Sequence, residues 1–383
     1  MADTNGTDKA TPSDAPSDAN AGCVGPTDQN AGKASACDGC PNQSACASGQ
    51  FNSPEAQEAA QQQVEALKSS LDNVSHVILV LSGKGGVGKS TVAAQLCHTL
   101  AGQGYAVGLL DVDLCGPSAP RMAMGSSFLT AQITRSGSGA WTPVYATPNL
   151  AVMSISFMLQ DHDAAVVWRG PRKNGLIQQF LTEVDWTGDT DGLDYLIVDT
   201  PPGTSDEHIS TVQYLQKAGA VAGAVIVTTP EEVSLADVRK EISFCHKTKV
   251  PILGVVENMG KYESPLSAMQ FEDSEGNDCT DSVLSTLREK CPEVLEKMVT
   301  ADIFNATSKA SGGGARAMSE KYGLEYWGML PLDKDLLACC EAGQAVATVH
   351  PNSKASKAFA KFAENIRQKL PVDEAKEDVV MQQ

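Results

Sequence analysis

The sequence has no apolar run long enough to cross a membrane, and it is poor in basic residues. Apolar segments such as 77–81 and 220–227 have the length of strands, far below the roughly 20 residues of a membrane-spanning helix. Lys and Arg number 29 against 47 Asp and Glu, and the resulting net charge of −18 argues against binding to a phosphate backbone. We therefore expect neither a membrane nor a nucleic acid as a partner.

The first 20 residues lack the basic and apolar regions of a secretory signal. They contain four Asp and only one Lys, which is also unlike an Arg-rich transit peptide. We expect a cytoplasmic protein whose 11 cysteines stay reduced. Such cysteines bind metal or pack in the interior rather than form disulfides.

Composition divides the chain into a polar extension and a larger domain. Residues 1–52 have almost no large apolar side chains, so they cannot build an ordinary core, and we expect a disordered, flexible extension. Residues 53–74 are expected to form a linker helix, because Val64, Leu67 and Leu71 recur at helical spacing. The remaining segments are a domain at 75–370, an irregular polar insertion within it at 261–311, and an acidic tail at 371–383.

From residue 76 onward, strands that are apolar on both faces alternate with segments of helix length. This pattern predicts an α/β fold, in which a mostly parallel sheet is covered by helices on both faces. We expect strands at 77–81, 106–110, 195–198, 221–228, 252–256 and 324–330, and helices that begin at Lys89, pass through Leu176 and Phe180, and span 234–245 and 353–370.

A glycine-rich loop of the form G-x-x-x-x-G-K-S follows the first of these strands. Backbone N–H groups in such a loop surround phosphate oxygens, and Lys89 and the helix N-terminus supply positive charge. Glycine permits both the close approach and the positive φ angles that the loop needs. Ser90 is the expected Mg²⁺ ligand. The predicted nucleotide-binding residues are Gly83, Lys84, Gly85, Gly86, Val87, Gly88, Lys89, Ser90 and Thr91.

Two acidic residues follow strands at distances that suit ATP hydrolysis. Asp199, at the end of the strand 195–198, is expected to hold Mg²⁺ directly or through water, and Asp113 is expected to orient the attacking water. The turn 201–203 is expected to place backbone N–H groups near the γ-phosphate. The alternative is that both aspartates only cap turns.

Four cysteines, Cys23, Cys37, Cys40 and Cys46, are spaced C-x13-C-x2-C-x5-C in the extension. Packing does not explain them, because this segment offers no core. Four thiolates at this spacing can enclose a [4Fe-4S] cluster. Structural zinc is the rival interpretation, although its usual signature is two close pairs and only one is present; incidental thiols are the third.

The additional lysine of the loop, Lys84, carries a resemblance to the deviant-P-loop ATPases, the group that includes MinD, ParA, ArsA, nitrogenase iron protein and the Mrp proteins. The resemblance implies an ATPase that dimerises, with Lys84 reaching across the interface to the nucleotide of the other subunit. Asn258 and the segment 331–333 are similar to the segments that lie beside the adenine in this group.

The cysteine spacing and the segments 167–181 and 194–208 are similar to the nucleotide-binding protein 35 type of the Mrp/NUBP family. That resemblance implies a weak ATPase that assembles [4Fe-4S] clusters and transfers them to cytosolic and nuclear apoproteins. It also implies a homodimer, or a heterotetramer with a shorter Mrp-type ATPase. The alternatives are a MinD/ParA-type positioning ATPase with a zinc-binding arm, and an electron-transfer reductase.

The chain departs from that family at residues 263–266, where the family carries a C-P-x-C motif for a cluster that bridges two subunits. The sequence there is Glu-Ser-Pro-Leu. Cys279 and Cys291 could replace the missing pair, but surface or packing thiols are the favoured interpretation. The other cysteines, Cys97, Cys115, Cys245, Cys339 and Cys340, are expected to pack or to be unsuited to joint ligation.

An apolar stripe of Phe359, Phe362, Ile366 and Leu370 marks the last predicted helix. Such a helix can lie on a membrane or pack in the interior. We favour interior packing, because the acidic tail that follows would be repelled by anionic lipid.

Overall fold

The computed structural model describes two units of the chain. Its described residues are 19–20, 22–26, 28–49, 53–114, 116–137, 139–158, 170–187, 192–203, 205–303 and 314–372. The units are Met1–Ser69 and Ser70–Gln383. Most of the acidic tail, the beginning of the segment 167–181, and residues 304–313 of the predicted insertion lie outside the described residues.

The first unit consists of turns and short helices around the four cysteines. It contains η1 (Ser35–Cys37), α1 (Gln43–Ala47) and nearly all of α2 (Pro54–Leu71). Five of its described glycines have positive φ angles between 70° and 96°, which lets the chain reverse direction repeatedly; they are Gly22, Gly25, Gly32, Gly39 and Gly49. Cys37 and Cys46 are buried in this unit.

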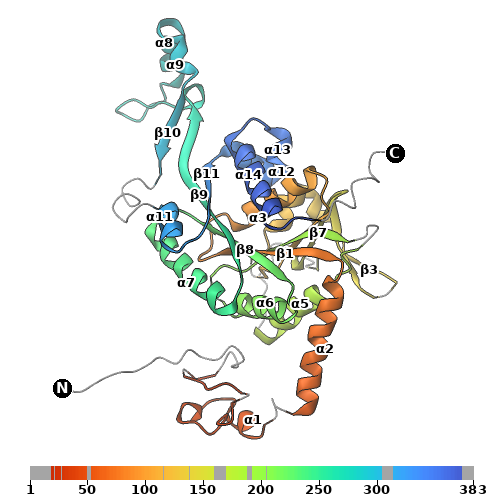
Figure 1. Cartoon of the computed structure of the whole chain (residues 1–383). Helices are drawn as coiled ribbons and strands as arrows, with labels where there is room; N and C mark the ends of the chain where they lie inside the picture. The colour runs from red at the N-terminus through yellow and green to blue at the C-terminus, as the bar shows by residue number, and fades with distance from the viewer. Residues whose placement is uncertain are drawn as a thin grey trace, which may run out of the picture. The chain divides into compact units, whose positions relative to one another are not determined.

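A nine-stranded sheet forms the centre of the second unit (Figure 1). Strands β10 and β5 are antiparallel to their neighbours and the other pairings are parallel, so the predicted mostly parallel α/β fold is confirmed. The order is β10 (Met298–Asp302), β9 (Ile252–Pro265), β8 (Val221–Thr228), β1 (Val74–Ser82), β7 (Leu193–Asp199), β2 (Val107–Asp111), β6 (Leu150–Ser154) and β5 (Val144–Thr147), with β11 (Tyr326–Leu332) also paired to β9.

Helices cover both faces of this sheet (Figure 1). One face carries α3 (Lys89–Gly102) and α14 (Lys354–Lys369), and the other carries α5 (Gly170–Thr182), α6 (Asp206–Lys217) and α7 (Glu232–Thr248). The smaller elements are α4 (Ala119–Met124), η3 (Gly125–Thr130), β3 (Thr134–Arg135), β4 (Trp141–Thr142), η4 (Ile155–Met158), α11 (Gly314–Lys321), α12 (Lys334–Ala342) and α13 (Val346–Val349).

The apolar stripe of α14 packs in the interior. Phe359, Phe362 and Ile366 are fully buried, and the Phe362 ring lies 6.1 Å from that of Trp327 on β11. Ser353 begins the helix by accepting a hydrogen bond from the N–H of Ser356. Within the described ranges, no helix combines the length and the hydrophobicity that a membrane span needs.

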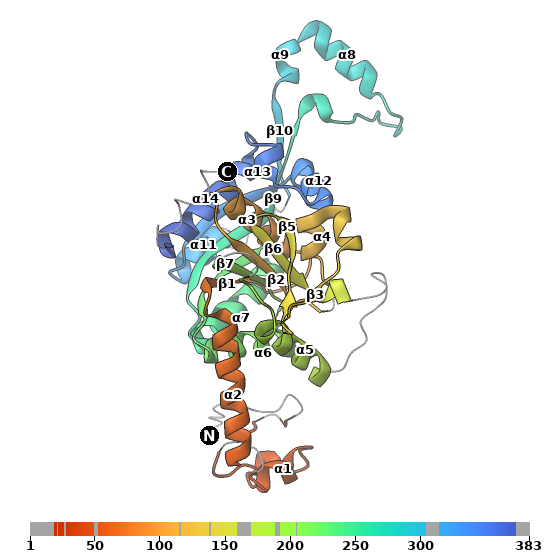
Figure 2. The same cartoon turned by 90° about the vertical axis from the view of Figure 1, so that its right-hand side faces the viewer.

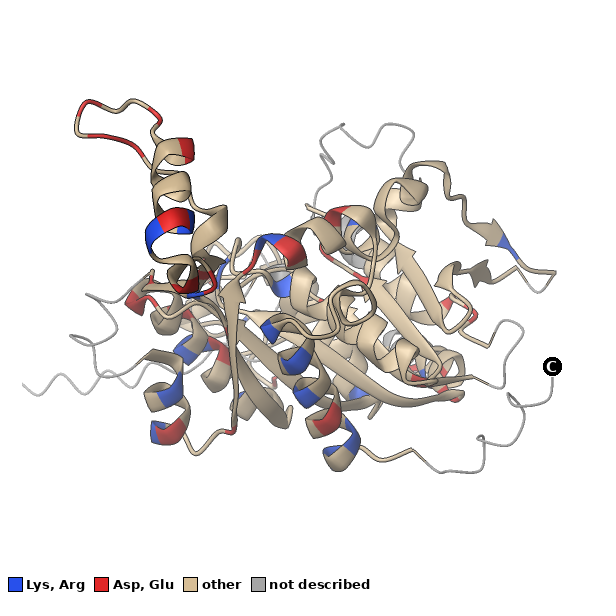
Figure 3. Ribbon diagram, turned by 90° about the horizontal axis from the view of Figure 1, so that it is seen from above, with Lys and Arg blue, Asp and Glu red and all other residues tan. Residues whose placement is uncertain are grey.

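The segment predicted to be an irregular insertion is more regular than expected. Strand β9 continues to Pro265 and pairs with β10, from Met298 opposite Pro265 to Asp302 opposite Lys261. This hairpin projects from the sheet and carries α8 (Thr280–Lys290) and α9 (Pro292–Leu295) (Figure 2). Glu272, Asp273, Glu275 and Asp278 make the loop before α8 acidic (Figure 3). Because β10 is mostly exposed, it lacks the apolar run that identifies the buried strands.

Candidate nucleotide and metal sites

The glycine-rich loop joins β1 to α3 and lines a cavity of about 230 Å³. Gly86 and Gly88 adopt φ angles of 79° and 85°, the left-handed region that the loop was predicted to need. The cavity is lined by Ser82, Lys84, Gly85, Gly86, Gly88, Lys89, Ser90, Thr91, Asp113, Gly116, Ser118, Met122 and Pro202. The structure thus brings most of the predicted nucleotide-binding residues together.

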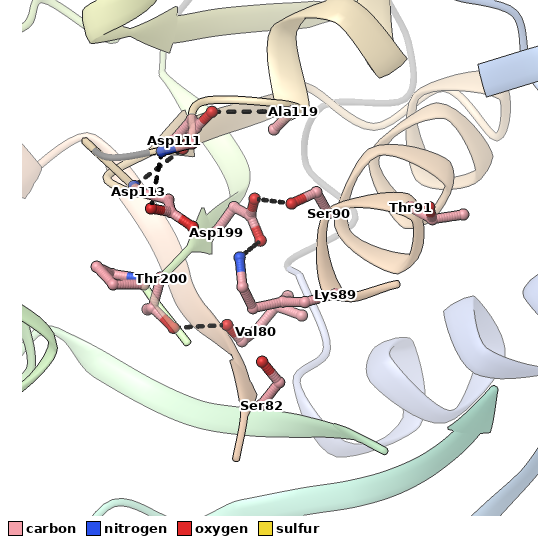
Figure 4. A network of polar contacts seen from close by, with 12 residues as sticks. Val80, Ser82, Lys89, Ser90, Thr91, Asp111, Asp113, Ala119, Asp199 and Thr200 are labelled. Carbon is pink, nitrogen blue, oxygen red and sulfur yellow. Dashed lines mark hydrogen bonds and ion pairs between the residues drawn. The ribbon is translucent and has the colours of Figure 1, made fainter. Parts of the chain in front are cut away.

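Lys89 and Ser90, which line this cavity, both contact Asp199 (Figure 4). Nζ of Lys89 donates to Oδ1 of Asp199 at 2.5 Å, and Oγ of Ser90 donates to Oδ2 at 2.6 Å. Asp199 is fully buried, since β7 carries it to the end of a buried strand beside β1. The lysine can neutralise phosphate charge, and the hydroxyl and carboxylate supply adjacent oxygen ligands of the kind that Mg²⁺ prefers.

The aspartate that ends β2, Asp111, and the one just after it, Asp113, have different surroundings. Asp113 lines the cavity, and its Oδ1 accepts the N–H of Gly116 at 3.3 Å. Asp111 is fully buried and accepts the N–H groups of Asp113 at 3.0 Å and Ala119 at 3.3 Å (Figure 4). Burial, followed by repulsion from Asp199, raises the pKa of Asp111 well above its ordinary value. Asp111 therefore shapes the loop that presents Asp113.

The turn after Asp199 differs from the expectation that its N–H groups face the γ-phosphate. Pro201 and Pro202 have no N–H, and the N–H of Gly203 donates to the carbonyl of Ser82 at 2.7 Å. Thr200 is anchored as well, because its hydroxyl donates to the carbonyl of Val80 at 2.9 Å. In this state the turn is tied to β1.

Lys84 forms an ion pair with Glu231, the residue that precedes α7. Burial acts to raise the pKa of Glu231, but hydrogen bonds involving Lys84 and Thr229 outweigh it and leave the pKa below its ordinary value. Sequence reasoning missed Glu231. The two residues are 147 positions apart, and no local pattern connects them.

Asn258 lies behind the loop, at the end of the buried part of β9. Its Nδ2 donates to the carbonyl of Val87 at 2.9 Å, and only 4% of the residue is exposed. A Cβ atom on Gly88 would lie 2.2 Å from that nitrogen. The structure therefore gives Asn258 a supporting contact with the loop, and its contact with adenine stays a prediction.

Three cysteines of the first unit lie close enough to Cys46 to influence its thiol. Burial raises the pKa of the Cys46 thiol, and Cys23, Cys40 and Cys37 raise it further through their negative charge. Cys23 Sγ accepts the N–H of Gly25 at 3.4 Å. Among the residues that the structure describes, no three or more His, Cys, Asp or Glu side chains are already arranged to hold a metal ion. The donor set fits a thiolate-bound group, and its ligation stays a prediction.

Cys279 and Cys291 do not form the close pair that a shared ligand site would need. They are the N-cap and C-cap residues of α8, which separates them by roughly 18 Å at 1.5 Å per residue. One chain cannot bring both thiols to a single ion in this arrangement. Cys97, Cys245, Cys339 and Cys340 are buried, and Cys115 lies outside the described residues.

The sheet, the loop and the Lys89–Asp199 pair define a P-loop nucleoside triphosphatase. A family model described as "ParA: NUBPL iron-transfer P-loop NTPase" matches residues 73–287. The chain therefore belongs to the NUBP family of P-loop NTPases, as the sequence resemblance predicted.

Three known proteins illustrate this relationship. The chain is 46% identical to a protein of Caenorhabditis briggsae named "Cytosolic Fe-S cluster assembly factor NUBP1 homolog", over 94% of this chain and 99% of that protein. A Brugia malayi protein of the same name is 45% identical, over 92% and 99%. A nucleotide-binding protein of Archaeoglobus fulgidus, solved with ADP, is 33% identical over 73% of this chain and 91% of that one, with a TM-score of 0.52.

Proposed function

We propose that this protein is an ATP-dependent scaffold in the cytoplasm, which assembles [4Fe-4S] clusters and transfers them to cytosolic and nuclear apoproteins. The names of its relatives support the assembly role. The observation that carries the proposal is that one unit, separate from the nucleotide site, holds Cys23, Cys37, Cys40 and Cys46, and that the other three thiols raise the pKa of Cys46. Iron–sulfur clusters are held by thiolates, and binding iron removes the cost of placing four negative thiolates together.

The nucleotide half of the proposal uses the cavity residues. Lys89 and the loop would bind the phosphates of ATP, Ser90 and Asp199 would hold Mg²⁺, and Asp113 would orient water. Hydrolysis is proposed to be weak, because the single chain keeps Lys84 paired with Glu231. Lys84 would reach a second subunit's nucleotide only after leaving Glu231, which makes activity depend on a homodimer or on a heterotetramer with a shorter relative.

The cluster is tested by the iron and sulfide content of chains purified without oxygen. We expect about four irons in the wild type and their loss in the Cys37→Ser/Cys40→Ser variant, as for a cluster held by Cys23, Cys37, Cys40 and Cys46. Cys279→Ser/Cys291→Ser is the control, since it also removes two thiols, both half-buried, and it should keep the iron. Colourless protein with bound zinc would refute the cluster and favour a zinc arm.

Coupling to ATP is tested with Lys89→Ala. The variant should accept a cluster, because its cysteines are intact, but it should transfer that cluster to an apoprotein more slowly than the wild type when Mg–ATP is present. Transfer at the same rate would count against a role for the nucleotide.

A further inference from the structure

A fully buried histidine and glutamate form a pair beside the nucleotide site. Nε2 of His208, on α6, lies 3.3 Å from Oε1 of Glu241, on α7, and neither side chain is exposed. Apart from this contact, neither Nε2 nor the two oxygens of Glu241 has a hydrogen-bond partner among the described residues. Burying polar groups costs free energy unless they form hydrogen bonds, so the protonation of this pair has to be explained.

The contact on the other side of the ring determines where its hydrogen lies. Nδ1 of His208 is 3.2 Å from the carbonyl oxygen of Pro201, which can only accept, so Nδ1 carries a hydrogen. In a neutral imidazole Nε2 is then an acceptor, and Glu241 has to present a hydrogen to it. Burial raises the pKa of Glu241 to about 8, consistent with a protonated carboxyl at neutral pH. The pair therefore shares one proton and keeps Nδ1 a donor.

The contact joins two parts of the nucleotide site. Pro201 begins the turn that follows Asp199, and the next residue, Pro202, lines the cavity. Glu241 is on α7, the helix that also contacts the beginning of the phosphate loop, since a Cβ on Gly83 would lie 2.6 Å from the backbone of Asp237. Phe244 of α7 packs on the His208 ring, with centroids 5.1 Å apart. The turn and the loop are thus both fastened to one helix.

We propose that His208 is a positioning residue for nucleotide hydrolysis: held by Glu241, it fixes the carbonyl of Pro201 and so places the Pro201–Gly203 turn against the cavity. The inference rests on the proposed ATPase activity and extends it to residues that do not touch the nucleotide. Gly203, at φ 70°, ends the turn, and its N–H donates to the carbonyl of Ser82 at 2.7 Å.

Two substitutions at His208 separate positioning from packing. The amide nitrogen of Asn takes the place of Nδ1 and can still donate to Pro201, whereas that of Gln takes the place of Nε2 and reaches only Glu241. We expect His208→Gln to lower kcat for Mg–ATP about 10-fold, with the affinity for a fluorescent ATP analogue within about 2-fold of wild type. His208→Asn should retain at least about a third of kcat, because it keeps the bond to the turn.

His98→Asn is the control for loss of a buried bond. Nε2 of His98 is 3.1 Å from the carbonyl of Ala123, and Asn cannot reach it. This variant should lower the melting temperature without lowering kcat. Equal losses of kcat in both His208 variants, or losses that follow the melting temperature in all three, would overturn the positioning role.

The same measurements distinguish this inference from the scaffold proposal. A wild-type chain that hydrolyses ATP but binds no iron refutes the scaffold and leaves the His208 comparison valid. A wild-type chain that binds nucleotide and iron but does not hydrolyse ATP refutes the positioning role together with the ATPase activity, and leaves the cluster intact.

Discussion

Nζ of Lys89 lies 2.5 Å from Oδ1 of Asp199, and the two residues are only 6% and 0% exposed. The residue that should neutralise phosphate is thus paired with the residue that should hold Mg²⁺. The other oxygen of Asp199 accepts from Ser90, the second expected metal ligand. If a nucleotide bound together with Mg²⁺, its phosphate would pair with Lys89 and the Asp199 carboxylate would hold the metal, so both members of the pair would keep a partner.

Asp199→Asn should remove the dependence of nucleotide binding on Mg²⁺. Hydrolysis should be lost, while metal-free ATP should bind at least as tightly as in the wild type, because Lys89 no longer has a competing carboxylate. The variant should also be about 3–5 kcal/mol less stable, as expected when one partner of a buried ion pair is removed. Nucleotide titrations with and without Mg²⁺, together with urea unfolding, check this.

Asp113→Asn is the companion variant at the same cavity. It should slow hydrolysis and leave the Mg²⁺ effect on binding intact. If Asp199→Asn still binds ATP more tightly with Mg²⁺ than without, by the wild-type ratio, the metal is held elsewhere.

Two inactive variants should restore activity to each other. A chain with Lys84→Ala keeps Lys89 in its own phosphate loop but cannot supply Lys84 to the nucleotide of its partner. A chain with Lys89→Ala supplies Lys84 to its partner but lacks the phosphate-binding lysine of its own loop. Their mixed dimer contains one complete site, so an equal mixture should recover roughly a quarter of wild-type hydrolysis if the chains pair at random. Hydrolysis rates of the separate and mixed proteins provide the measurement.

Lys240→Ala serves as the control for that experiment. Lys240 is an exposed lysine paired with Asp237, and the variant should be active alone. If the Lys84→Ala chain is fully active by itself, or if the mixture hydrolyses ATP no faster than the separate variants, Lys84 does not act on the nucleotide of a second subunit and only forms its ion pair with Glu231.

Buried strands and the phosphate loop could be predicted from the sequence because their signals are local. Strand β8 has the predicted bounds, Val221 to Thr228, and most of its residues are buried, as an apolar run between two helices requires. The loop glycines have the predicted φ angles at Gly86 and Gly88, because only that conformation lets the backbone turn into α3.

Contacts between distant elements could not be predicted in this way. Glu231 opposite Lys84 and Glu241 opposite His208 are set by where α7 packs, and a lone glutamate on a helix gives no local sign of its partner. Strand β6 is absent from the predicted strands although all five of its residues are buried, because a short apolar run fits a strand and a buried helix equally well. The separation of Cys279 from Cys291 follows from α8, whose polar sequence resembles a loop.

Gly88→Ala should damage nucleotide binding more than Gly86→Ala. Both glycines have positive φ, so alanine strains either position by about 1 kcal/mol. At Gly88 the new Cβ also meets Nδ2 of Asn258 at 2.2 Å, whereas nothing lies within 4 Å of a Cβ at Gly86. The Kd for Mg–ATP, measured by titration, should therefore rise severalfold more for Gly88→Ala. Equal effects would mean that Asn258 moves aside without disturbing the loop.

The buried His208–Glu241 pair should make stability depend on pH in a defined window. Burial raises the pKa of Glu241 from 4.5 to about 8, so its contribution is complete below pH 4.5 and is lost as pH rises to about 8. Burial lowers the pKa of His208 from 6.5 to about 4, so its contribution is complete above pH 6.5 and is lost as pH falls. Between pH 4.5 and 6.5 the two residues change the free energy of unfolding in opposite directions, and their effects cancel. Above pH 6.5 only the contribution of Glu241 still changes, and the free energy of unfolding falls by about 2 kcal/mol by pH 8.

Urea unfolding at pH 6.5 and pH 8.0 measures this loss, and Glu241→Gln should abolish it because glutamine does not titrate. The neighbouring charged and titratable groups are Lys89, which also lowers the pKa of His208, and Cys245. Burial and Glu241 raise the pKa of the Cys245 thiol to about 12, so this thiol does not titrate in the window. Glu232→Gln, at the exposed beginning of the same helix, should keep the wild-type loss. If Glu241→Gln loses as much stability as the wild type, Glu241 is already ionised at pH 6.5, and the proton that holds the Pro201 contact must come from His208 alone.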